Sequence, residues 1–125
     1  MAIIYGRDPD GRATVAVPLS NDPRSATLYV DDHTRVIAAL GPAKWFVNSN
    51  GWGNVHVRAR LPRGGNVMVA RLVMDAGPGV LMVRPRDRDP FNLRSSNLDT
   101  VRRGSASTKI LAAMLASRST RRERP

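Results

Sequence analysis

Apolar and polar residues alternate in two short stretches near the start of the chain, at residues 13–17 and 26–30. Alternation with a period of two places every second side chain on the same face, so each stretch is predicted to form a half-buried strand. Between them, residues 18–23 begin and end with proline and are mostly polar. This composition predicts a loop.

A helix is predicted directly after the second strand. Val36, Ile37 and Leu40 share one face at helical spacing. Either Asp31 or Asp32 can cap the N-terminus of this helix, and the Gly-Pro step after Leu40 ends it.

The middle of the chain predicts a hairpin. Residues 44–47 and 53–59 flank an Asn-Ser-Asn-Gly segment, and its Asn-Gly step is typical of a tight β-turn. The remaining pattern predicts strands at residues 66–69 and 80–83 and helices at residues 70–75, 93–101 and 107–117. The order of these elements indicates an α+β fold.

Length and composition favour one compact domain of 125 residues, 42% of them hydrophobic. Since the chain has no cysteine, disulfides and thiolate metal sites are excluded. It has neither a basic leader followed by an apolar run nor an apolar segment of about 18 residues, so we expect a soluble cytoplasmic protein that does not contact membranes.

The charge is strongly positive and unevenly distributed. The chain has 20 Lys and Arg against 10 Asp and Glu, a net charge of +10, and 18 of its cations are arginine. Residues 1–40 have four basic and five acidic side chains, net −1, whereas residues 41–125 have sixteen and five, net +11. A polyanion is therefore the expected partner.

A motif in the second half resembles a known family. Residues 83–98 read V-R-P-R-D-R-D-P-F-N-L-R-S-S-N-L, which is similar to the HNH endonuclease motif V-D-H-I-N-G-N-P-L-D-N-R-x-S-N-L. Shorter segments also resemble phage and homing members of that family, in the family's order: residues 30–32, 44–48, 50–52, 71–74 and 76–79. The resemblance extends over roughly residues 28–103.

The resemblance implies a ββα-metal core in which a His activates water and an adjacent Asp, together with a helix Asn or His, holds one divalent cation. In this chain Arg84 stands at the Asp position, Pro85 at the His position, and Ala70 at the His of a preceding His-Arg pair. Of the metal ligands only the helix position, Asn97, persists. We therefore expect no cofactor, no metal and no hydrolysis by the family mechanism.

The same resemblance divides the chain into an N-terminal extension with a strand at residues 1–25, an HNH-like domain at 26–104, and a C-terminal helix with a basic tail at 105–125. In the last segment, apolar side chains at helical spacing form a stripe that packs on its own domain, on a second copy or on a partner protein. This stripe consists of Ile110, Leu111, Met114 and Leu115.

Arginines are the candidate DNA ligands. Arg84, Arg86 and Arg88 would project to one side if their backbone is extended, although Asp87 and Asp89 could instead neutralise them. The complete candidate set is Arg71, Arg84, Arg86, Arg88, Arg94, Arg102 and Arg103. Other residues with possible site chemistry, namely His33, His56, Trp45 and Trp52, are expected to have structural roles.

Together these features predict a non-catalytic protein that binds double-stranded DNA on a degenerate HNH scaffold. We expect it to be encoded by a phage or another mobile element and to act in regulation, packaging or replication. The alternatives are a phage-type inhibitor that binds a host enzyme, a nuclease with a relocated metal site, and a binder of structured RNA.

Overall fold

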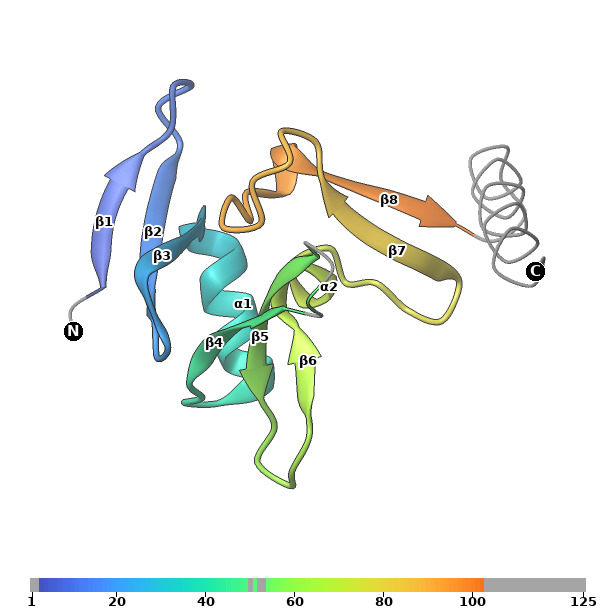
Figure 1. Ribbon diagram of the computed structural model, residues 1–125. Helices are drawn as coiled ribbons and strands as arrows, with labels where there is room; N and C mark the ends of the chain where they lie inside the picture. Colours follow the sequence, from blue (N-terminus) through green and yellow to red (C-terminus); the bar gives the residue numbers. More distant parts are fainter. Residues whose placement is uncertain (1–2, 50, 52–53, 103–125) are drawn as a thin grey trace.

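The computed structural model describes residues 3–49, 51 and 54–102 (Figure 1). Its first half contains β1 (Ile4–Arg7), β2 (Ala13–Leu19), β3 (Asp22–Tyr29), α1 (Val30–Leu40) and β4 (Trp45–Ser49). Its second half contains β5 (Val55–Arg60), β6 (Asn66–Met68), α2 (Val69–Val73), β7 (Val80–Pro85), a 3-10 turn (Ser95–Asn97) and β8 (Leu98–Arg102). Small antiparallel sheets and two helices therefore make up the described part of the chain, which confirms a mixed α and β fold.

The first sheet has the order β1-β2-β3 and confirms the two strands predicted there. The loop predicted at residues 18–23 is wrong, because Pro18 pairs with Ser25 and Leu19 with Asp22. Proline cannot donate to a ladder, and the register shifts between Pro18 and Leu19. The predicted domain boundary after residue 25 falls inside β3.

Helix α1 starts where β3 ends, so its N-cap is Tyr29, with no side-chain cap. The predicted caps Asp31 and Asp32 lie in the first helical turn instead, where a carboxylate is favoured by the positive end of the helix dipole. The end of the helix is confirmed: Gly41 has φ 72° and donates its N–H to the Ile37 carbonyl over 2.7 Å.

The second sheet has the order β4-β5-β6 and contains the predicted hairpin, with Trp45 opposite Ala59. Strand β6 passes directly into α2, close to the predicted strand at 66–69 and helix at 70–75. The Trp45 side chain is 2% exposed and lies in the core, as predicted. Trp52 lies outside the described residues.

The third sheet is the β7-β8 pair, and here one helix prediction is wrong. Residues 93–101 do not form a helix: they contain the 3-10 turn and then β8, whose Asp99 pairs with Arg84 of β7. Strand pairing with β7 overrides a helical pattern based on only a few apolar positions. Asn97 therefore lies in a turn between two strands and not on a metal-binding helix.

Residues 103–125 lie outside the described part of the chain. Several predictions fall on them: Arg103, the helix at 107–117 and the apolar stripe of Ile110, Leu111, Met114 and Leu115. None of the helices in the described ranges is long and apolar enough to cross a membrane.

One hydrophobic core joins the three sheets and both helices. It extends from Val15 in β2 through Val36 in α1 and Trp45 in β4 to Leu98 in β8. The first sheet also reaches the β7-β8 connection through the backbone, since Thr27 donates to the Phe91 carbonyl over 2.8 Å and accepts from the Leu93 N–H over 2.7 Å. These contacts position the segment that precedes β8.

Candidate nucleic-acid interface

The connection from β7 to β8 is shaped by three short polar side chains. Asp87 Oδ2 accepts from the Asn92 amide at 2.8 Å, and Asp87 Oδ1 accepts from the Asn97 amide at 3.0 Å and from the Asp89 backbone N–H at 2.9 Å. These bonds, with that of the Asn92 amide contributing most, lower the pKa of Asp87. Asn97 is 8% exposed and also donates to the Asn92 carbonyl over 3.0 Å. Its amide therefore holds the loop in shape.

This loop breaks the row of arginines that the sequence predicts. Arg84 belongs to β7, but the chain turns immediately afterwards: the Arg88 N–H reaches the Pro85 carbonyl at 3.4 Å, and Arg88 has φ 65°. A residue in the left-handed region cannot continue an extended strand. The condition under which Arg84, Arg86 and Arg88 would project to one side, an extended backbone from 84 to 88, is therefore not met.

Arg84 and Arg86 share Asp99 as a counterion, which is neither of the two carboxylates, Asp87 and Asp89, that the sequence offers for them. Arg84 Nη2 lies 3.8 Å from Asp99 Oδ2, and Arg86 Nη2 lies 3.9 Å from Asp99 Oδ1. Asp99 lies directly opposite Arg84 in the register of the two strands. Sequence reasoning missed Asp99 because its proximity to Arg84 depends on the strand pairing.

All three of these side chains remain accessible. The exposed fractions are 56% for Arg84, 64% for Arg86 and 44% for Asp99. Both N···O distances exceed the length of a charge-assisted hydrogen bond. Two guanidinium groups face one carboxylate, so this cluster retains a net positive charge on an accessible surface.

Two other candidate arginines are engaged in holding the fold. Arg71 Nη2 donates to the carbonyls of Ala76, Gly77 and Val80, at 3.5, 3.2 and 3.1 Å. This guanidinium thus supports the turn between α2 and β7.

Arg94 is only 24% exposed and approaches Asp8 Oδ2 at 3.4 Å. Its Nε donates to Asn92 Oδ1 over 3.0 Å. Arg102 is exposed at the end of β8.

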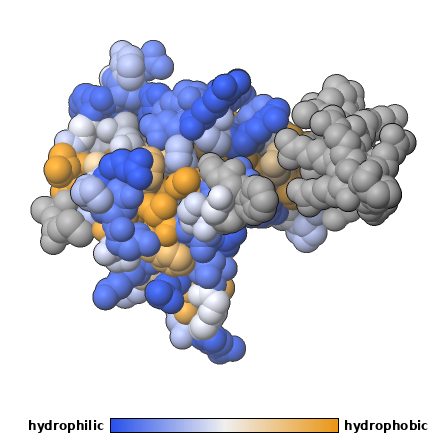
Figure 2. Space-filling model, viewed as in Figure 1, coloured by the Kyte–Doolittle hydropathy of each residue, from blue (hydrophilic) through white to orange (hydrophobic). Residues whose placement is uncertain are grey.

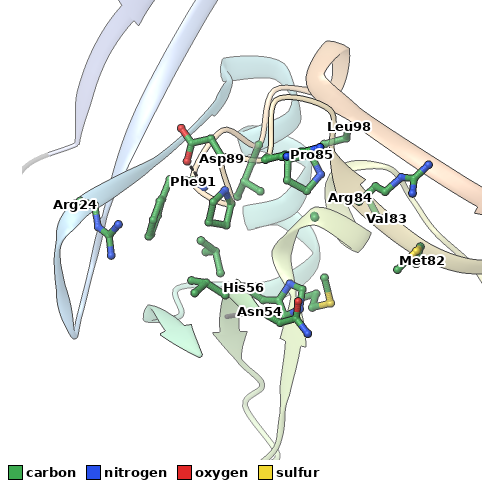
Figure 3. Close-up of a pocket in the computed structure, with 17 residues that line it drawn as sticks. Arg24, Asn54, His56, Met82, Val83, Arg84, Pro85, Asp89, Phe91 and Leu98 are labelled. Carbon is green, nitrogen blue, oxygen red and sulfur yellow. Dashed lines mark hydrogen bonds between the residues drawn. The ribbon is translucent and has the colours of Figure 1, made fainter. Parts of the chain in front are cut away.

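A pocket of about 590 Å³ lies beside Arg84, between β5 and the β7-β8 connection. Figure 3 shows His56 and Asn54 on one side of it and Pro85 on the other, with Phe91 and Arg24 at one end. Figure 2 shows hydrophobic surface in the middle of this face of the molecule, with hydrophilic surface around it.

Three positions that the HNH resemblance aligns with catalytic residues come together in this pocket. Ala70 of α2 lines it together with Arg84 and Pro85, the last two residues of β7. Their side chains are a methyl group, a guanidinium and a pyrrolidine, none of which accepts a proton from water or binds a divalent cation.

The two histidines lie in different surroundings, and His56 lines the pocket beside Asn54 (Figure 3). His33 packs edge to face against Trp45 with 6.0 Å between the ring centroids, and burial lowers its pKa. Burial also lowers the pKa of His56, and the positive charge of Arg58 lowers it further. Within residues 3–49, 51 and 54–102, no three His, Cys, Asp or Glu side chains gather in a way that could hold a metal ion.

Neither a family model, nor a curated protein, nor a solved structure matches this chain. The assignment to an HNH-like family therefore stays a hypothesis based on the residues that carry it.

Proposed function

We propose that this protein binds double-stranded DNA through the β7-β8 hairpin without cleaving it, on a scaffold derived from an HNH endonuclease. The observation that carries the proposal is the cluster of Arg84, Arg86 and Asp99. The exposed guanidinium groups of Arg84 and Arg86 each lie near a different oxygen of the Asp99 carboxylate. Because one negative charge cannot balance two positive charges, the cluster attracts a further anion.

Arginine suits a phosphate better than lysine does, because its planar fork presents two parallel N–H groups to two oxygens. Arg88 adds a third cation on the loop that follows, at the edge of the pocket that Arg84 also lines. The net charge of +10 on the whole chain supports a polyanion as the partner. Such contacts position a protein on the DNA backbone and do not by themselves select a sequence.

The absence of hydrolysis is proposed from side-chain chemistry. HNH cleavage needs a carboxylate to bind the metal and an imidazole to take the proton of water. At the aligned positions Arg84 would repel a divalent cation, and Pro85 has no titratable group. A DNA-binding role in phage regulation, packaging or replication is consistent with a nuclease scaffold that has lost its catalytic groups.

The test compares two charge-matched double variants by fluorescence anisotropy on labelled duplex DNA across a salt titration. Arg84→Gln/Arg86→Gln removes the cluster, whereas Arg7→Gln/Arg63→Gln removes two exposed arginines elsewhere. We expect the first variant to bind about tenfold more weakly, with a salt slope smaller by about 0.9 for each phosphate contact that is lost.

The control variant should lose less affinity. Equal losses in both variants would show that only the total charge matters and that the hairpin is not the interface. Plasmid incubated with the protein and Mg²⁺ should remain uncut. Nicking activity that co-purifies with the protein would refute the non-catalytic part of the proposal.

A further inference from the structure

We infer that Arg84 and Arg86 form a binding site for a phosphate group, called here the phosphate seat, and that Asp99 occupies it in the free protein. The inference deepens the proposed function and rests on it only for the source of the phosphate, a DNA backbone. It assigns to Asp99 the role of a positioning residue that limits affinity.

The geometry resembles a bridged oxyanion. Asp99 Oδ2 faces Arg84 and Asp99 Oδ1 faces Arg86, so the two oxygens of one carboxylate serve two different guanidinium groups. A phosphate group also offers two oxygens to a pair of arginines. Asp99 therefore holds the position that a phosphate would take on binding.

Asp99 is a weak occupant. Asp99 belongs to β8, and the strand register fixes its backbone opposite Arg84. The carboxylate therefore cannot move closer to both guanidinium groups as a free anion could. The N···O distances of 3.8 and 3.9 Å are those of ion pairs without a hydrogen bond. A diffusing phosphate can instead approach each guanidinium to about 2.8 Å, the length of a charge-assisted hydrogen bond.

Two effects of Asp99 on phosphate binding oppose each other. Its negative charge helps to keep the two arginines together, but it repels the incoming phosphate. Half-exposed ion pairs of this length restrain their partners little. The repulsion acts on every bound phosphate, so it outweighs the restraint. Removal of the Asp99 charge should therefore strengthen phosphate binding.

The first experiment measures DNA affinity for Asp99→Asn, which keeps the shape of the side chain and removes its charge. Asp10→Asn is the control, because Asp10 is exposed on the β1-β2 turn and its substitution changes the net charge equally. We expect Asp99→Asn to bind about three- to tenfold more tightly at low salt, and Asp10→Asn to gain less than about twofold, because distant exposed charges are screened. A destabilised fold would weaken binding, so a gain cannot arise from structural damage.

The second experiment uses inorganic phosphate alone and does not depend on DNA. Thermal unfolding is followed in sodium phosphate and in sodium chloride at equal ionic strength. We expect phosphate to raise the Tm of Asp99→Asn by about 2 °C or more above its effect on the wild type, since a ligand stabilises the state that binds it. The increase should disappear in Arg84→Gln/Asp99→Asn, which lacks half of the seat.

The two experiments separate the two proposals. If the wild type binds DNA but Asp99→Asn gains neither DNA affinity nor a phosphate-dependent Tm, the seat is refuted and DNA binding stands. If no variant binds DNA but phosphate stabilises Asp99→Asn through Arg84, the seat stands and DNA binding is refuted. Equal gains for Asp99→Asn and Asp10→Asn would also refute the seat.

Discussion

The hydroxyl of Tyr29 donates a hydrogen bond of 2.8 Å to Asp8 Oδ2, and the Asp8 side chain is only 2% exposed. The same Tyr29 hydroxyl lies 2.7 Å from Ser96 Oγ. Asp8 also accepts from the Arg94 guanidinium at 3.4 Å. One buried phenol thereby joins the end of β3 to the β1-β2 turn and to the segment before β8, which positions the β7-β8 connection against the first sheet.

Removal of this hydroxyl should weaken the fold. Tyr29→Phe leaves the Asp8 carboxylate without one donor, and we expect the free energy of unfolding to fall by about 1–3 kcal/mol. Urea unfolding followed by circular dichroism measures the change. Tyr5→Phe is the matched control: Tyr5 is 69% exposed, so its loss should stay within about 0.5 kcal/mol. Equal losses would show that the Tyr29 hydroxyl adds nothing specific.

Acid should destabilise the protein through three carboxylates. The hydrogen bond from Tyr29 lowers the pKa of Asp8, the bonds from Arg24 lower the pKa of Asp22 to about 2, and the Asn92 amide lowers the pKa of Asp87. A carboxyl whose pKa is lower in the folded state stabilises the fold above its unfolded pKa, and this contribution is lost as pH falls through the folded pKa.

We therefore expect the urea midpoint to decrease slightly as pH falls from about 7 to 5, because burial disfavours the charged forms of His33 and His56, and to decrease more steeply below about pH 4. Tyr29→Phe should decrease less steeply, because its Asp8 lacks the main cause of the lowered pKa. A midpoint that is the same at pH 3 and pH 7 would contradict the expectation.

The role of Asn97 can be tested with a carboxylate. Asn97→Asp should destabilise the protein by about 1–3 kcal/mol at neutral pH, because two amide hydrogen bonds are lost and a charge is placed beside Asp87. The loss should shrink at low pH, where the carboxylates are protonated. A vestigial metal ligand predicts a different result, in which Asn97→Asp gains stability on addition of Mg²⁺.

Arg71 should affect stability and not DNA affinity. Arg71→Met removes the donor to the three carbonyls at Ala76, Gly77 and Val80, and we expect a loss of about 1–3 kcal/mol in the free energy of unfolding. Arg71→Lys should recover little, because an ammonium group lacks the planar fork. Duplex DNA affinity of the folded Arg71→Met protein should decrease by less than about twofold at moderate salt. A loss as large as that of Arg84→Gln would place Arg71 in the interface.

The sequence predicted secondary structure correctly where an apolar pattern repeats over several neighbouring positions. It failed where the same residues are compatible with two kinds of element. Alternation at residues 13–17 and helical spacing around Val36 each repeat over several positions, so their elements are confirmed. Around Leu98 the apolar residues are few, and pairing with β7 decides between helix and strand. The prolines at 18 and 23 predict a loop, but Pro18 lies within β2 and Pro23 within β3.

The candidate site shows the same division. The excess of arginine and the unsuitability of Arg84 and Pro85 for metal chemistry both follow from residue identity. The ion pairs of Asp99 and the bonds of Asn97 depend on which segments lie next to each other in space.

The sequence by itself determined the composition of the surface charge, the single core and most strands and helices, because side-chain polarity and backbone propensity act over a few neighbouring residues. Tertiary structure alone decided that Ala70, Arg84 and Pro85 line one pocket, that Asp99 faces two arginines, and that Tyr29 joins Asp8 to Ser96. These contacts connect residues that are between 13 positions (Arg86 and Asp99) and 67 positions (Tyr29 and Ser96) apart, and their formation depends on strand register and core packing, which no local pattern specifies.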